Sequence, residues 1–157
     1  MLLLWSCAAL ALTLFGGIAW ALAPLDPGIL ALQMAFTPLR FGEVIHAWPA
    51  NHLLLYRQHF VADFVLLLAY AALGYLLATR TRAFGAVGQM GKRLARWSLP
   101  LAAVFDALEN LLHLWLTEVP RFGVPLAYAV SGSCSLLKWL WLLGFGCLLA
   151  YALVKTP

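Results

Sequence analysis

The feature that most constrains this chain is an apolar stretch, residues 99–116, that carries a stripe of polar side chains. The stretch is long and apolar enough to cross a bilayer. Asp106, Glu109, Asn110 and His113 follow the spacing i, i+3, i+4, i+7, so on a helix they share one face. Ionisable groups inside a membrane span are costly and face protein or a cavity. The stripe therefore predicts a buried polar site within a membrane-spanning helix.

The composition places the whole chain in a membrane. Of its 157 residues, 64% are hydrophobic and 10% are charged, and the mean hydropathy is +0.91. A soluble domain is about 45–50% apolar and about one quarter charged. The length suits a single integral membrane domain over residues 1–157. The net charge of +4 comes from basic residues beside apolar runs, which topology explains without nucleic-acid binding.

Four apolar runs predict an all-α fold, a bundle of four transmembrane helices. The spans are expected at about residues 2–23, 60–79, 97–117 and 124–154. A span of about 20 residues is about 30 Å long, which matches the hydrocarbon thickness of a bilayer. Small residues at 131–135 leave a second start for the last span open, near residue 133.

The connection between the first two spans predicts helical segments of its own. One short helix is expected from Ile29 to Phe36, and a second, opened by Thr37 and Pro38, is expected to end near Trp48. The second segment is amphipathic, so residues 28–48 suit the water–lipid interface, a lid packed over the bundle, or both at once.

The orientation follows from the distribution of basic residues. The predicted loop over residues 80–97 contains five lysines and arginines and no acidic residue, whereas the connections on the other side mix both charges. The positive-inside rule therefore predicts that this loop and both termini are cytoplasmic.

Further ionisable residues are expected at membrane depth opposite the stripe. Asp63 and Tyr70 belong to the second span and Lys138 to the fourth. Lys138 is the only strong cation available to Asp63, Asp106 and Glu109. We therefore expect at least one of Asp106 and Glu109 to hold a proton at neutral pH, or His113 to be charged.

The leading hypothesis is a pocket within the membrane, open to the outer side, for a ligand with a polar head and an apolar tail. A lipid, a quinone or an isoprenoid fits this description. The residues expected to contact the ligand are Asp63, Tyr70, Asn110, His113 and Lys138. In an enzyme, Glu109 or Asp106 would act as the acid or base, and Lys138 would stabilise an anion.

Two other functions fit the same residues. The polar cluster could fix helix register in an accessory or assembly subunit of a larger membrane complex, or in a homo-oligomer. It could also line a path for protons or ions. All three hypotheses make membrane lipids partners of the chain, and none of them names a cofactor.

Metal binding has weak support. His46, His52 and His59 could form a histidine-rich patch near the outer end of the second span, and Glu43 precedes His46 by three residues. This spacing is not diagnostic of a metal site. We expect no metal here.

A set of short motifs resembles a family of small four-span bacterial membrane proteins without an assigned activity. The motifs are Phe36-Thr-Pro with Ala47-Trp48, Asp63-Phe64 with Tyr70, Asp106-x-x-Glu109-Asn110, and Lys138. The resemblance covers most of residues 29–150. It implies a four-span bundle in the bacterial cytoplasmic (inner) membrane, with Asp63, Asp106, Glu109, Asn110 and Lys138 as its polar positions.

Overall fold

The computed structural model is built from helices and describes residues 1–119 and 121–155. In chain order the helices are α1 (Leu2–Leu22), α2 (Ile29–Gln33), α3 (Pro38–Ala47), α4 (Ala50–Arg80), α5 (Gln89–Leu116) and α6 (Pro125–Lys155). Four of them, α1, α4, α5 and α6, are long and apolar enough to cross a membrane. The predicted all-α bundle with four candidate spans is thereby confirmed.

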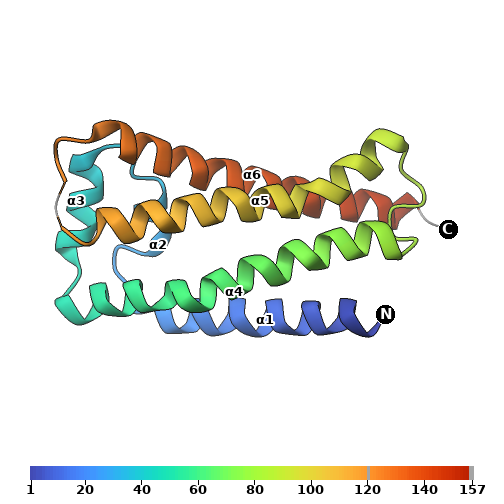
Figure 1. Cartoon of the computed structure of the whole chain (residues 1–157), viewed down its shortest axis with the longest axis horizontal. Coiled ribbons are helices and arrows are strands. Elements are labelled where there is room, and N and C mark those ends of the chain that lie inside the picture. The colour runs from blue at the N-terminus through green and yellow to red at the C-terminus, as the bar shows by residue number, and fades with distance from the viewer. Residues whose placement is uncertain (120, 156–157) are drawn as a thin grey trace.

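The four long helices pack in the order α1, α4, α5, α6, each mainly against its neighbours in that series. Figure 1 shows α1 and α6 at opposite edges of the bundle, with α4 and α5 between them. Both chain ends lie at one end of the bundle, and α2 and α3 lie at the other. Because α1 packs mainly on α4 and α6 mainly on α5, the side between α1 and α6 lacks close backbone packing.

Two of the long helices, α4 and α5, begin well before the expected spans, and α6 fits its expected span closely. Helix α4 begins at Ala50. Pro49 directly precedes its first turn, a position where a proline is tolerated. Helix α5 begins at Gln89, so the prediction of a loop up to residue 97 is wrong. Lys92, Arg93 and Arg96 are good helix formers, and they continue the helix beyond its apolar part. Helix α6 begins at Pro125, the earlier of the two starts considered.

The segment between the first two long helices caps one end of the bundle. Thr37 Oγ1 accepts a hydrogen bond of 3.3 Å from the backbone N of Arg40, and Pro38 occupies the first turn of α3. Phe41 and Trp48 are buried in a core that includes Tyr56 of α4 and further side chains from α1, α5 and α6. Residues 28–48 therefore pack over the bundle, as expected for a lid.

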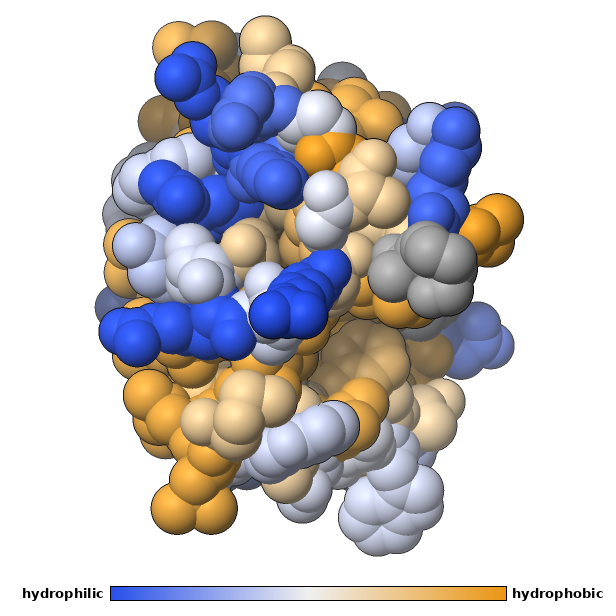
Figure 2. All heavy atoms as spheres, turned by 90° about the vertical axis from the view of Figure 1, so that its right-hand side faces the viewer, coloured by the Kyte–Doolittle hydropathy of each residue, from blue (hydrophilic) through white to orange (hydrophobic). Residues whose placement is uncertain are grey.

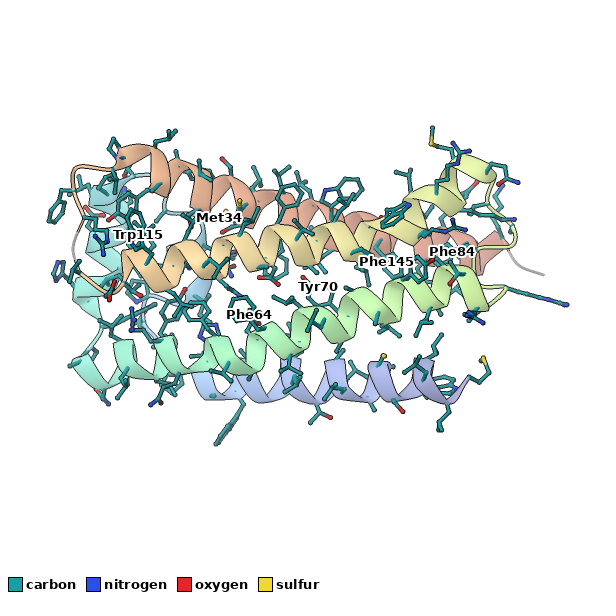
Figure 3. The ribbon with its side chains drawn as sticks, in the orientation of Figure 1. Met34, Phe64, Tyr70, Phe84, Trp115 and Phe145 are labelled. Atoms are coloured by element: carbon teal, nitrogen blue, oxygen red, sulfur yellow. The ribbon has the colours of Figure 1, made fainter. Side chains whose placement is uncertain are left out.

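The other end of the bundle has its own apolar core. Phe84, in the turn after α4, contacts Phe145 of α6 with ring centroids 5.7 Å apart (Figure 3).

Near this end, Gly74 of α4 lies directly against Leu99 of α5, where an added Cβ would be 2.6 Å from the Leu99 Cβ. Pro100 lies inside α5, which is not straight in Figure 1. The two central helices thus approach closely because one of them has no side chain at the contact.

Basic side chains gather at the end that carries both termini. Figure 2 shows a cluster of hydrophilic residues over this end, beside a hydrophobic region. Arg80, Arg82, Lys92, Arg93 and Arg96 are exposed and belong to the end of α4, the following turn and the start of α5. This is the end that the positive-inside rule predicts to be cytoplasmic.

Candidate functional site

Helices α5 and α6 bring three charged side chains into direct contact. The Nζ atom of Lys138 lies 3.0 Å from Asp106 Oδ1 and 2.6 Å from Glu109 Oε2. Lys138, Asp106 and Glu109 retain only 4%, 6% and 1% of their exposure. Buried charges are tolerated when they are paired in this way. Lys138 is thus the shared cation of two carboxylates on successive turns of α5.

Helix α4 adds two more of the predicted side chains. Tyr70 donates a hydrogen bond of 2.9 Å from its hydroxyl to Asp106 Oδ2. Figure 3 shows Tyr70 in the space between α4 and α5. Asn110 donates from Nδ2 to Asp63 Oδ2 over 2.6 Å. The polar cluster, as we name the set Asp63, Tyr70, Asp106, Glu109, Asn110 and Lys138, thus joins three helices.

The polar cluster lies deep in the bundle. Asp63 is close to the midpoint of the 31-residue helix α4, and Lys138 is close to the midpoint of the equally long α6. A helix of this length extends about 46 Å, which exceeds the hydrocarbon thickness of about 30 Å. The cluster is therefore at mid-membrane depth if the long helices cross the bilayer.

A cavity of about 530 Å³ lies beside the polar cluster. All six residues of the cluster line it. Its remaining walls come from four helices and are mostly apolar. They consist of Ala11, Leu12, Phe15, Ile18 and Ala19 of α1, Ile29, Leu30 and Gln33 of α2, Tyr56, His59, Leu66 and Leu73 of α4, and Trp139 and Leu142 of α6.

The cavity reaches the outer surface of the bundle between α1 and α6. Leu12 and Phe15 line the cavity and are at the same time exposed on the outside of α1. Trp139 and Leu142 form the opposite wall on α6. Since these two helices do not pack closely on each other, the opening faces sideways, toward the lipid that would surround the spans.

Helix α2 covers the end of the cavity that points toward α3. Gln33 accepts a hydrogen bond of 3.0 Å from Trp139 Nε1, which joins α2 to α6. Ile29 and Leu30 complete this cover. The cavity is therefore covered at this end, whereas its lateral side is apolar and open.

His113, the remaining residue of the predicted stripe, lies outside the cavity lining. Its Nδ1 is 2.5 Å from the hydroxyl of Tyr56, and its ring packs edge-on against Phe41 with centroids 5.3 Å apart. Tyr56 does line the cavity. His113 therefore holds Tyr56 in place and does not itself face the space beside the cluster.

Tyr56 and Gln33 are among the lining residues that do not follow from the sequence analysis. Tyr56, His59 and Asp63 have the spacing i, i+3, i+7 and share one face of α4, but this pattern is visible only if the helix starts before residue 56. For Gln33 no sequence signal exists, because its partner Trp139 is far along the chain.

The three histidines weighed as metal ligands have different surroundings. His46 is exposed on α3, and His52 is half-buried near the start of α4. His59 lies in the cavity wall and donates from Nδ1 to the backbone O of Tyr56. Within residues 1–119 and 121–155, no group of three or more histidine, cysteine or acidic side chains is placed to hold a metal ion.

Fold and site together define the class of this protein as a multi-pass α-helical membrane protein with a buried charged cluster. No family model, curated protein or solved structure matches the chain.

Proposed function

We propose that this chain is a four-span protein of the bacterial cytoplasmic membrane that binds an amphiphile, such as a lipid, a quinone or an isoprenoid, in the lateral cavity. The ligand head lies at the polar cluster, and its tail lies between α1 and α6. One observation carries this proposal: a cavity with apolar walls and a charged floor that reaches the outer surface of the bundle between α1 and α6.

The size and lining of the cavity suit such a ligand. Ligand pockets measure about 300–1,000 Å³ and combine apolar walls with a few polar groups that fix orientation. A volume of about 530 Å³ accommodates a head and the first part of a tail. The rest of the tail continues into the surrounding lipid past Leu12 and Phe15, at no cost in exposed apolar surface.

Helix registry alone does not account for the arrangement. Asn110 with Asp63 joins α5 to α4, and Lys138 with Asp106 joins α6 to α5, so two contacts connect all three helices. Such a function needs neither a second carboxylate on Lys138 nor an adjoining cavity. If the bound amphiphile is a substrate, Glu109 or Asp106 is the acid or base and Lys138 the group that stabilises an anion.

The variant Glu109→Gln tests the proposal. Glutamine preserves the side-chain shape and leaves the pair of Lys138 with Asp106 intact. We expect a folded protein that carries at least tenfold less co-purified amphiphile, because a charged group is lost from the head site. The measurement is mass spectrometry of lipids extracted from protein purified in a mild detergent, expressed per mole of protein.

Glu118→Gln, in the exposed turn after α5, is the matched control and should carry the wild-type amount of amphiphile. Unfolding of Glu109→Gln, with normal ligand content in the fraction that stays folded, would mean that the cluster only holds helices together. Wild-type protein without any bound amphiphile would also contradict the proposal.

A further inference from the structure

Asp63 differs from the other carboxylates of the polar cluster because it has no cation beside it. Asp106 and Glu109 share Lys138. Asp63 accepts a hydrogen bond on Oδ2 from Asn110, and among the described residues it has no ion pair within 4.0 Å. Asp63 is half-buried and lines the cavity. One oxygen of this carboxylate is thus left for a group inside the cavity.

The charges around the cavity favour a positive guest. Three carboxylates line it, Asp63, Asp106 and Glu109, whereas Lys138 is the one lysine or arginine in its lining. The other titratable groups in the lining are Tyr56, His59 and Tyr70, which lie on α4 together with Asp63. The lining residues of α1 and α2 carry no charge. Charges at membrane depth pair with one another, so an unpaired carboxylate here favours a cation from the ligand.

Aromatic side chains surround the same space. Tyr56, Tyr70 and Trp139 line the cavity together with Asp63. The Nζ atom of Lys138 already lies over the Trp139 ring, 5.7 Å from its centroid. Aromatic faces attract ammonium groups, and cages of such rings recognise quaternary ammonium ligands. The lining thus offers a carboxylate and aromatic faces, the two kinds of group that bind an alkylammonium head.

We propose that the amphiphile bound in the lateral cavity carries an ammonium head, which pairs with Asp63 while its alkyl tail leaves between α1 and α6. This inference rests on the proposed function and names its ligand class. A phosphate or carboxylate head is disfavoured because Lys138 is already paired with two carboxylates and the remaining charge of the site is negative. The shared chemistry is the ammonium group, which can be a primary amine or a quaternary ammonium.

Four probes with the same oleyl tail test the head group: oleylamine, oleyltrimethylammonium, oleyl alcohol and oleyl phosphate. The full chain in a nonionic detergent is titrated with each probe, and binding is followed by the shift of the thermal unfolding midpoint. We expect at least one ammonium probe to bind at least tenfold more tightly than the alcohol, and the phosphate to bind most weakly. The comparison of the two ammonium probes separates a primary amine from a quaternary one.

Asp63→Asn tests the assigned partner of the head. Asparagine still accepts the hydrogen bond from Asn110, so the contact between α4 and α5 persists while the charge is removed. We expect the preference for ammonium over alcohol to fall at least tenfold. Glu43→Gln, an exposed acid on α3 outside the cavity, is the matched control and should retain the preference.

The outcomes separate the inference from the proposed function. Equal or tighter binding of the alcohol or the phosphate, or an unchanged preference in Asp63→Asn, would overturn the ammonium head and leave amphiphile binding intact. If none of the four probes binds, the proposed function itself fails. Should Asp63→Asn not fold, the order of the four probes on the wild-type chain decides the inference alone.

Discussion

Replacing Lys138 with methionine is expected to lower the free energy of unfolding by about 3–5 kcal/mol. The change removes the cation that lies 3.0 Å from Asp106 and 2.6 Å from Glu109, and it leaves both carboxylates buried without a positive partner. Deleting one partner of a buried ion pair is strongly destabilising, because the other charge stays buried without a partner. Replacing the whole pair with uncharged residues costs far less. The measurement is reversible unfolding of the purified chain in mixed micelles of a mild detergent and sodium dodecyl sulfate.

An exposed ion pair provides the matched control. Arg40 lies 3.0 Å from Glu43 on α3, with side chains that are 75% and 50% exposed. Arg40→Met should cost less than about 1 kcal/mol because solvent screens this pair. Adding Asp106→Asn and Glu109→Gln to Lys138→Met should restore most of the lost stability. Wild-type stability of Lys138→Met would show that Asp106 and Glu109 do not need this cation in the folded protein.

Replacing Gly74 with alanine is expected to lower the free energy of unfolding by about 1–3 kcal/mol, the usual effect of overpacking a close contact. The new Cβ would lie 2.6 Å from the Cβ of Leu99, an atom fixed to the backbone of α5. The two helices must therefore move apart, and small residues are what allow membrane helices to approach closely. The same unfolding assay measures the loss of stability.

Gly144→Ala on α6 is the control for Gly74→Ala. Among the described residues, no atom outside the adjoining turns of α6 lies within 4 Å of the Cβ position at Gly144, so the substitution changes helix propensity without a steric clash. We expect Gly144→Ala to be as stable as the wild type or slightly more stable. Equal behaviour of the two variants would mean that the contact between Gly74 and Leu99 does not limit the packing of α4 on α5.

Much of the fold and part of the site follow from local patterns in the sequence. The spacing of Asp106, Glu109 and Asn110 puts them on one helix face whatever the tertiary structure is. Charges at membrane depth must be paired, so Asp63 and Lys138 are the expected partners of this face. The structure places both in hydrogen-bond or ion-pair contact with it.

Other features depend on tertiary packing and are not visible in a single sequence. The start of α4 at Ala50 is stabilised by the α2–α3 cap, which buries Tyr56 at the end of the bundle. When the helix is expected to begin only near residue 60, Tyr56 is not recognised as part of the α4 face that carries Asp63. The cavity itself arises because α1 and α6 do not pack closely, and such a gap has no local signature.

Photo-crosslinking of a ligand tail in intact membranes tests amphiphile binding in the lateral cavity most directly. The probes are oleylamine and oleyl alcohol with a diazirine in the tail, and the labelled peptides are identified by mass spectrometry. We predict saturable labelling of residues 12–19 and 139–142. The labelling should be lost in Ala19→Trp, because the indole occupies the cavity from its α1 wall. It should be retained in Ala9→Trp, which changes α1 outside the lining. Labelling spread evenly over exposed apolar residues such as Leu143 and Leu153, and unaffected by Ala19→Trp, would contradict the account.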